Sequence, residues 1–366
     1  MPRRAGTPPG DALIVESNRS ISPEMQRINP AEDSNWNALL AAQPRRSFFH
    51  TAEWAKVLAD TYGYAPVYFG AGAADGRSSW LPLMEVDSWL TGRRGISLPF
   101  TDDCAPLCAE AETFQTIFRD AVAYGKSRGW KYIESRGGRE LFHEVPASLS
   151  FYGHSLDLTA GEDELFSRLE SSVRRAIRKA EKSGVTVEVL QSQEAVRVFY
   201  ALQCLTRKKH GLPPQPLRFF LNIHRHVLSQ NMGMVVLARH QGRPVAGSVH
   251  FNFGGQAIYK YGASDETYQD LRGGNLVMWT AIKEHVRRGV RHLDLGRTSV
   301  GNEGLRKFKL GWGAAEYRIE YVKFDLKKNK FVTDADGSSG WHTRVFRRLP
   351  VFLSRALGGV LYRHWA

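Results

Sequence analysis

Residues 293–313 read Leu-Asp-Leu-Gly-Arg-Thr-Ser-Val-Gly-Asn-Glu-Gly-Leu-Arg-Lys-Phe-Lys-Leu-Gly-Trp-Gly, and the rest of the chain is organised around this stretch. The apolar run at residues 292–295 predicts a short strand that breaks at Gly296. A loop of small polar residues follows, and three basic residues then surround Phe308. Because ligands of open α/β sheets bind where strands end in such loops, the stretch predicts a functional site. A strand, a loop and a solvated basic helix turn without function is the alternative.

The length and charge of the chain narrow its class. At 366 residues it exceeds the usual size of a single hydrophobic core, so two domains are expected. Hydrophobic residues make up 42% and charged residues 24%, as in an ordinary globular protein. The net charge of +13 favours an anionic partner. A nucleotide phosphate, a polyanionic envelope polymer, a membrane surface and RNA all remain open.

The cysteine content and the hydropathy pattern indicate the compartment. Three cysteines are too few and too poorly spaced for a zinc site or a disulfide framework, which fits a reducing compartment. No secretory segment and no run of 18 apolar residues is present. A cytoplasmic protein without a metal cofactor is therefore expected.

A short pattern recurs at two boundaries between a helix and a strand. Residues 128–134 read Arg-Gly-Trp-Lys-Tyr-Ile-Glu and residues 288–294 read Arg-Gly-Val-Arg-His-Leu-Asp, an offset of 160 residues. Each heptad closes a predicted long helix and opens a predicted short strand. Gly76-Arg77 and Gly242-Arg243 likewise fall in predicted hairpin turns. We interpret these matches as a duplicated α/β unit; chance likeness between two such segments is the alternative.

Apolar periodicity divides the chain into four segments. They are a disordered N-terminal segment (1–28), a first domain (29–154), a second domain (155–330) and a basic amphipathic tail (331–366). In the second domain, one helix is expected over residues 162–183, ended by Gly184. Successive antiparallel strands between residues 234 and 263 are followed by a helix over residues 275–288 and the strand at residues 292–295.

The crossover helix at residues 275–288 marks the expected position of the site. Its N-terminus lies where the strands on either side of it part, and a helix N-terminus offers unpaired N–H groups to a phosphate. The tract before it reads Gln269-Asp-Leu-Arg-Gly-Gly-Asn275. Arg272, Gly273 and Gly274 are therefore candidates for cofactor binding, and Asn275 for substrate binding. A flexible loop and helix cap is the alternative.

Three motifs resemble those of a known family. Gly-x-x-x-Leu-x-x-Phe-Lys-x-x-x-Gly after Asp-Leu-Gly-Arg is similar to the C-terminal signature of the FemAB/FemX family of peptidyl and acyl transferases. Residues 173–185 are similar to the basic helix that opens the family's second domain, and Phe49-His-Thr-Ala-Glu-Trp54 is a weaker third match. The motifs span about residues 48–325 in family order. The closest resemblance is to FemAB-like proteins that accompany exosortase and exopolysaccharide loci.

The resemblance implies an α/β (α+β) fold of two tandem GNAT-like domains, the acyl-CoA N-acyltransferase fold, with mixed and mainly antiparallel sheets flanked by helices. It also implies attack of an amine on an activated acyl group. Lys309, expected to be exposed, would hold the acyl donor or stabilise the tetrahedral oxygen, and Phe308 would wall the acyl or nucleotide group. From its position at the end of the predicted strand, Asp294 could accept a proton or orient Arg297; capping of a neighbouring loop is the alternative. Ser299 is a further substrate-binding candidate.

Two other pairs of residues are candidates for substrate binding. Tyr259 and Tyr261 alternate along one predicted strand and could line the pocket, although such tyrosines are often half-buried core. Arg175 and Arg178 lie one turn apart on the basic helix and could together hold a phosphate of the acceptor. A solvated basic helix face is the alternative for the arginines.

Three departures from the family pattern bear on the substrates. A coenzyme A site of this fold would read Gln/Arg-x-x-Gly-x-Gly/Ala, and the tract at residues 269–275 does not have that spacing. Trp54-Ala-Lys-Val-Leu58 replaces the Trp-x-x-Val-Lys of members that build peptidoglycan bridges, which disfavours a UDP-linked acceptor. The long helical arm of tRNA-using members is absent, which disfavours aminoacyl-tRNA. An acyl-CoA, acetyl or longer, stays open as the donor, and aminoacyl-tRNA is the less favoured alternative.

These observations favour an N-acyltransferase that modifies an amine on a cell-envelope or exopolysaccharide precursor. A non-catalytic module of the same fold that binds an anionic polymer or nucleic acid is the alternative, although interleaved aromatics typical of single-strand binders are lacking. Residues 341–366 carry five arginines and no acid, with apolar residues at three- and four-residue steps. They predict an amphipathic helix, interrupted near Pro350 and Gly358-Gly359, that packs on the body or lies on an anionic inner membrane.

Overall fold

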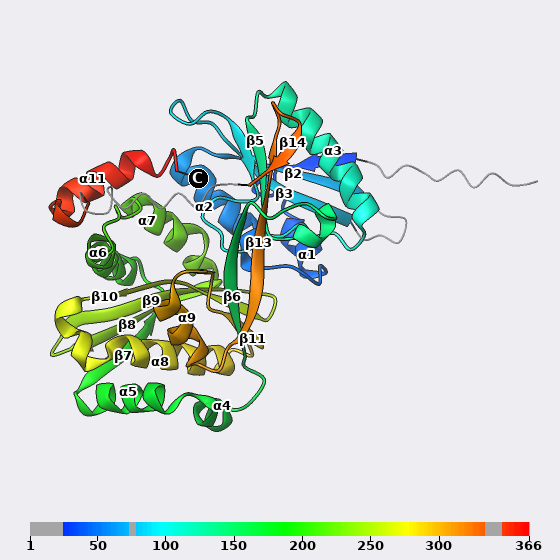
Figure 1. Cartoon of the computed structure of the whole chain (residues 1–366). Coiled ribbons are helices and arrows are strands. Elements are labelled where there is room, and N and C mark those ends of the chain that lie inside the picture. The colour runs from blue at the N-terminus through cyan, green and yellow to red at the C-terminus, as the bar shows by residue number, and fades with distance from the viewer. Residues whose placement is uncertain (1–24, 73–77, 334–345, 366) are drawn as a thin grey trace, which may run out of the picture.

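The computed structural model describes residues 25–72, 78–333 and 346–365. In this part of the chain one continuous, mainly antiparallel sheet runs through the whole molecule (Figure 1). From one edge to the other its strands are β1 (Met25–Ile28), β2 (Ala65–Gly72), β3 (Ser78–Val86), β4 (Arg94–Ile96), β5 (Tyr132–Arg136), β13 (Ala315–Asp325), β6 (Leu149–Asp157), β11 (His292–Asp294), β10 (Gln256–Ser264), β9 (Arg243–Phe253), β8 (Gly233–His240) and β7 (Val185–Leu190). Two short strands lie off this path: β12 (Thr298–Ser299) pairs with β6, and β14 (Lys330–Val332) pairs with β13.

Helices cover both faces of the sheet in each half. They are α1 (Trp36–Ala41), α2 (Ala52–Tyr62), α3 (Ala111–Ser127), α4 (Glu162–Arg168), α5 (Ser171–Lys182), α6 (Gln193–Lys209), α7 (Leu217–His226), α8 (Gly273–Arg287), α9 (Glu303–Leu310) and α11 (Val351–Leu361). In the half built from β7 to β10, α8 and α5 cover one face, and α6 and α7 cover the other. In the half built from β1 to β5, α3 packs on one face and α2 on the other. The predicted α/β class with a mixed sheet flanked by helices is confirmed.

The two halves share strands and a hydrophobic core. β13 pairs with β6 over Ala315–Tyr321 and with β5 over Tyr321–Asp325, so one strand belongs to both halves. Trp54 of α2 packs edge-on against Phe219 of α7, with ring centroids 5.9 Å apart, and Phe48 stacks on Phe251 of β9 at 4.5 Å. Aromatic contacts of this kind bury large apolar areas and make the halves one packed unit.

The predicted segment boundaries differ from the structure at three places. The predicted boundary between residues 154 and 155 falls inside β6. This strand pairs with β13 on one side and with β11 on the other, so it belongs to both halves. Residues 25–28, at the end of the segment predicted as disordered, form β1 and pair with β2; residues 1–24 lie outside the described residues. Residues 331 and 332, assigned to the tail, belong to β14.

The recurring heptads have the same local structure. Gly129 and Gly289 follow the ends of α3 and α8 with φ of 71° and 72°, a left-handed conformation that favours glycine. The next residues, Trp130 and Val290, are buried, and their N–H groups donate to carbonyls of the preceding helix. β5 then pairs in parallel with β4, and β11 pairs in parallel with β10. Both halves therefore contain a strand, a crossover helix and a parallel strand; Gly76-Arg77 lies outside the described residues.

Two helix predictions need correction. Residues 162–183 form two helices, α4 and α5, because the chain is extended at Leu169 and the N–H of Glu170 donates to the carbonyl of Gly311. The apolar residues at four-residue spacing are nevertheless all buried: Leu165, Leu169, Val173 and Ile177. The predicted interruption near Pro350 is observed, because α11 begins only after this residue, but the helix continues through Gly358-Gly359, where a second interruption was predicted. No helix of the described residues has the length and hydropathy needed to cross a bilayer.

Candidate active site between the two halves

The site begins where two parallel strands separate. β10 pairs with β11 only from Gln256 to Ile258, and beyond this point β10 continues beside β9 alone. A register shift between Tyr259 and Tyr261 leaves Lys260 as an extra residue, which is a β-bulge. The chain leaves β11 after Asp294 and turns at Gly296, which has a φ of 74°. An opening therefore forms beside the N-terminus of α8, as the order of elements predicted.

A cavity of about 350 Å³ lies at this helix end, and we call it the helix-end cavity. Six of the sequence candidates line it: Tyr259, Arg272, Gly273, Gly274, Asn275 and Phe308. No side chain caps the N-terminus of α8, so its first N–H groups are available to a ligand. Gly274 faces open space, since a Cβ built there would have no atom within 4 Å. Uncapped N–H groups beside Arg272 suit a phosphate-bearing donor.

The bulge in β10 separates the two tyrosines that were expected on one face. Tyr259 pairs with His250 and Tyr261 with the adjacent Val249, so the two side chains leave the strand on opposite faces. Tyr259 lines the helix-end cavity, where burial raises its pKa to about 12. Tyr261 instead packs against Phe220 and is part of the core, so its prediction as a pocket residue is not supported by the geometry.

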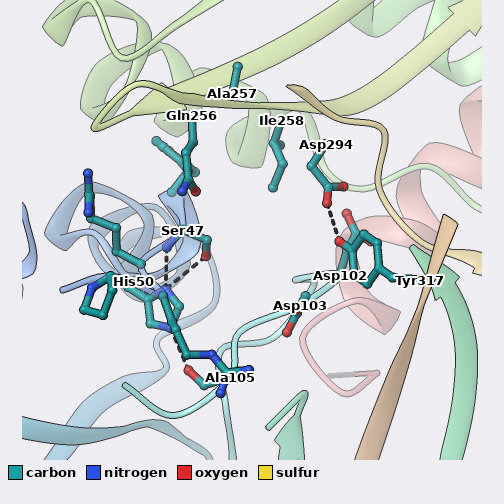
Figure 2. A pocket seen from close by; sticks show the side chains of 14 residues that line it. Ser47, His50, Asp102, Asp103, Ala105, Gln256, Ala257, Ile258, Asp294 and Tyr317 are labelled. Atoms are coloured by element: carbon teal, nitrogen blue, oxygen red, sulfur yellow. Dashed lines mark hydrogen bonds between the residues drawn. The ribbon is translucent and has the colours of Figure 1, made fainter. Parts of the chain in front are cut away.

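A second cavity, of about 260 Å³, lies between the two halves (Figure 2). We call it the acidic cavity because three carboxylates line it: Asp102 and Asp103 from the loop after β4, and Asp294 at the end of β11. Gln256 and Ile258 point into it from β10 in Figure 2. The other lining residues are Pro44, Arg45, Arg46, Ser47, Phe48, His50, Ala105, Ala257 and Tyr317.

Hydrogen bonds hold two of the three carboxylates. Asp294 accepts from the hydroxyl of Tyr317 at 2.5 Å and from the N–H of Gly296 at 2.5 Å. Asp102 accepts from the ammonium of Lys260, the bulge residue, at 2.9 Å. One oxygen of Asp103 is buried and has no hydrogen-bond partner. A carboxylate without partners in a buried place favours its protonated form.

The pKa values of the three acids differ accordingly. Burial, together with the charge of Asp294, raises the pKa of Asp103 to about 7. Burial also raises the pKa of Asp294, although the bond from Tyr317 opposes this. For Asp102 the effect of burial is outweighed by Lys260 and Arg297, and its pKa is lowered. One acid that stays ionised beside one that titrates near neutral pH is an arrangement found at many acid–base active sites.

The sequence analysis did not select Asp102 and Asp103. They follow a loop in which Leu98 and Phe100 have positive φ values of 44° and 62°, an uncommon conformation for side chains of this size. Such strain often occurs at functional sites. The only signal in the sequence is that the two acids are adjacent. Asp294, which lines the same cavity, lies far away in sequence, so residue spacing could not predict that the three acids are close together.

Lys309 lies differently from its prediction. Its side chain was expected to be exposed but is buried, with 2% of its surface accessible. Its ammonium donates to the carbonyls of Gly296 at 2.7 Å and Arg297 at 3.1 Å. Burial lowers its pKa to about 8, against the opposing charges of Asp102 and Asp294. It comes from α9, which Asn302 caps by accepting from the N–H of Leu305. Lys309 therefore fixes the position of the loop after β11 through these two hydrogen bonds.

Arg297 and Ser299 lie near the site without lining either cavity. Arg297 donates to the hydroxyl of Tyr321 at 2.5 Å and stacks over Phe151 at 4.5 Å. Its nearest acid is Asp102, at 3.7 Å, so the expected orientation of Arg297 by Asp294 is not observed. Ser299 is exposed on β12.

Arg175 and Arg178 line a separate surface hollow of about 400 Å³ with Lys179, Lys182 and Ser183. This basic hollow shares no residue with the helix-end cavity or the acidic cavity. The structure therefore brings the two arginines together, as predicted, but not into the cavities beside β10.

Comparisons with known proteins agree with this architecture. Residues 167–318 match the sequence model of the family described as acetyltransferase (GNAT) domain. No curated protein sequence matches the chain. The crystal structure of FemX is similar over 83% of this chain and 98% of its own, with a TM-score of 0.67 and 15% identity.

Two further solved structures share the fold. L-PGS from Bacillus licheniformis is similar over 90% of this chain and 98% of its own, with a TM-score of 0.53 and 13% identity. A tandem GNAT protein from the clavulanic acid biosynthesis pathway is similar over 83% of this chain and 99% of its own, with a TM-score of 0.52 and 11% identity. The chain therefore has a FemX-like GNAT fold, and the match to the acetyltransferase (GNAT) domain model lies in its second half.

Proposed function

We propose that this GNAT-fold chain is an N-acyltransferase in which the helix-end cavity holds the acyl donor and the acidic cavity holds the amine that accepts the acyl group. One observation carries the proposal. The consecutive residues Ile258 and Tyr259 of β10 line the acidic cavity and the helix-end cavity respectively. Donor and acceptor bound in the two cavities would meet at the point where β10 leaves β11.

The acidic cavity suits an acceptor that arrives as an ammonium ion. Three carboxylates attract a cation, and Asp102 remains ionised because Lys260 and Arg297 lower its pKa. Attack requires the neutral amine, so a base must remove a proton. Asp103, with a pKa of about 7, is matched to this task at neutral pH. Asp294 is held in place by Tyr317 and would complete the recognition of the amine.

The helix-end cavity has residues of the types that bind the phosphates of an acyl-CoA. The spacing of its glycines, however, differs from that of a coenzyme A site of this fold. The uncapped N–H groups of α8 and the side chain of Arg272 would bind phosphate, and the open space at Gly274 admits a close ligand. Phe308 would pack against the acyl or nucleotide group. When bound, the donor supplies the activated acyl carbonyl.

Lys309 would contribute positive charge where negative charge develops on the acyl oxygen. Two of its three N–H groups are bound by backbone carbonyls, which fixes the position of the ammonium. A fixed charge needs no reorganisation during the reaction, which is the basis of electrostatic catalysis. The acceptor we propose is an amine on a cell-envelope or exopolysaccharide precursor, with the basic hollow at Arg175 and Arg178 binding a phosphate of that precursor.

Two measurements on the full-length protein test this proposal. Acetyl-CoA, a long-chain acyl-CoA and an aminoacyl-tRNA are compared at saturating concentration for their effect on Tm, because a ligand that binds only the folded state must raise it. Acyl transfer to a panel of amines is then followed with the donor that binds. We expect an acyl-CoA to raise Tm and transfer to require an amine. If no donor raises Tm while an anionic polymer does, the chain is a binding module and the proposal is wrong.

A further inference from the structure

Helix α11 packs on the molecule through its small residues and turns its large apolar residues outward. Ser354 and Gly358 are buried against the body, and a Cβ at Gly358 would lie 2.0 Å from the carbonyl oxygen of Pro214. On the outer side, Phe352 is 67% and Val360 62% exposed, and Leu357 is also exposed. The contact at Gly358 is too close for any larger residue. Rotation of the helix therefore cannot bury its apolar side.

A second apolar group continues this surface at the end of the helix. Trp89, 83% exposed, and Leu90 project from the loop between β3 and β4. The ring of Trp89 lies 5.2 Å from that of His364, and the exposed Trp365 follows directly. We call the exposed residues of both groups the α11 face: Trp89, Leu90, Phe352, Leu353, Leu357, Val360 and Trp365.

The α11 face is held rigidly in its outward position. Tyr362 donates to the carbonyl of Pro213, and its own carbonyl accepts from the hydroxyl of Tyr64. His364 is bound to the hydroxyl of Ser88 at 2.8 Å, and its carbonyl accepts from Arg94 at 3.0 Å. The helix lies along the outside of the molecule beside α6 and α7 (Figure 1). These bonds show that α11 is a docked element, and within the described part of the chain nothing covers its apolar side.

The charged side chains of residues 346–365 are all basic, although Arg347 also borders Asp265 and Glu266 in a surface hollow. Arg347, Arg348, Arg355 and Arg363 are exposed, and residues 346–365 contain no acid. The nearest acid of the Trp89 loop, Asp87, is paired with Arg93 at 2.8 Å. A second copy of the chain in a two-fold dimer would bring this positive face against itself. An anionic surface with an apolar interior complements both features of the face.

We infer that the α11 face is a docking surface for an anionic lipid bilayer. At 11 residues, α11 is too short to span the bilayer and would lie in its interface, with Phe352 and Val360 entering the acyl region. The arginines would lie at the level of the lipid phosphates, and Trp89 and Trp365 at the headgroup boundary, where tryptophan is enriched. This inference does not rest on the proposed function, although it would bring the chain to a lipid-linked acceptor.

Sedimentation of the full-length protein with vesicles tests the inference. Vesicles of phosphatidylcholine with phosphatidylglycerol are compared with vesicles of phosphatidylcholine alone. The charge variant is Arg347→Gln with Arg348→Gln, and its control is Lys327→Gln with Lys330→Gln on the β13–β14 hairpin. The apolar variant is Phe352→Ser with Val360→Ser, and its control is Leu39→Ser, an exposed leucine of α1.

We expect binding to the anionic vesicles only. Each basic residue at an anionic surface adds about fivefold to partitioning, so the charge variant, which lacks two, should bind roughly 25-fold more weakly. The apolar variant should lose at least about tenfold, and neither control should change. Three results would overturn the inference: equal binding to both vesicle types, absence of binding, or equal effects of variants and controls. A dimer detected by light scattering that the apolar variant disperses would assign the face to a second copy instead.

Discussion

The ammonium nitrogen of Lys309 lies 2.7 Å from the carbonyl oxygen of Gly296, the residue at which the chain turns away from β11. The lysine thus connects α9 to the loop that carries Asp294 and Arg297. Any side chain at position 296 would also approach Asp102, because a Cβ there would lie 3.2 Å from its carboxylate. The geometry of the acidic cavity therefore depends on a buried cation that the reaction would also use.

Replacement of Lys309 should affect both stability and activity. Lys309→Ala leaves two backbone carbonyls without their donor and should lower the free energy of unfolding by roughly 2–4 kcal/mol. It should also abolish acyl transfer. Lys309→Arg should rescue transfer poorly, because a planar guanidinium cannot occupy the position of the ammonium. Urea denaturation and turnover measure the two effects. If the alanine variant kept full stability and full turnover, Lys309 would be needed neither for the fold nor for acyl transfer.

The stability of the protein should depend on Asp103 in a defined pH range. Its pKa is raised from 3.8 to about 7, so the folded chain binds more protons than the unfolded chain between these values. Its contribution to stability is therefore complete below about pH 4 and is lost as the pH rises through 7. Asp103→Asn should unfold with a free energy roughly 2–4 kcal/mol higher than wild type at pH 8, and the difference should vanish near pH 4. Denaturation curves across this range provide the check.

Acyl transfer should have two titrations. We expect kcat/KM to rise with pH through about 7, as Asp103 ionises and becomes a base, and to fall above about 8, as Lys309 loses its proton. The residual activity of Lys309→Arg should lack the fall at high pH, because arginine stays charged. A flat profile between pH 6 and 9 would argue against both assignments.

The open space at Gly274 permits a test of the donor site. Gly274 lines the helix-end cavity, a Cβ atom there would have no other atom within 4 Å, and the backbone needs no positive φ. Gly274→Leu should therefore raise the donor KM at least about tenfold and leave Tm within a few degrees of wild type. Gly161→Leu, at the start of α4 and also in open space, is the matched control. Unchanged donor kinetics in the first variant would place the donor elsewhere.

The basic hollow on α5 can be separated from the two cavities by choice of acceptor. If Arg175 and Arg178 bind a phosphate of the acceptor, replacing both with glutamine should raise the KM of the complete acceptor and flatten its salt dependence. A short amine that reaches only the acidic cavity should be unaffected, as should donor binding. If the double variant and wild type had equal kinetics with the complete acceptor, these arginines would be solvated surface residues that do not bind it.

Local features of the sequence predicted local structure well. The heptads at residues 128–134 and 288–294 predicted the same helix end, glycine turn and strand in both halves, because these features depend on neighbouring residues and on the conformational freedom of Gly129 and Gly289. Helical spacing identified the buried face shared by α4 and α5. The order of strands and helices also placed Gly273 and Gly274 at a cavity beside the N-terminus of α8.

Long-range contacts decided the rest. The bulge at Lys260 moved Tyr261 to the opposite face from Tyr259, and a single inserted residue leaves no periodic signal. Burial of Lys309 follows from the carbonyls of the loop after β11, and no pattern within α9 indicates it. Asp103 meets Asp294 only because the halves share a sheet through β6 and β13. Sequence alone determined which chemical groups were present and on which elements; the tertiary structure decided which were buried together, and burial sets the pKa values on which the chemistry depends.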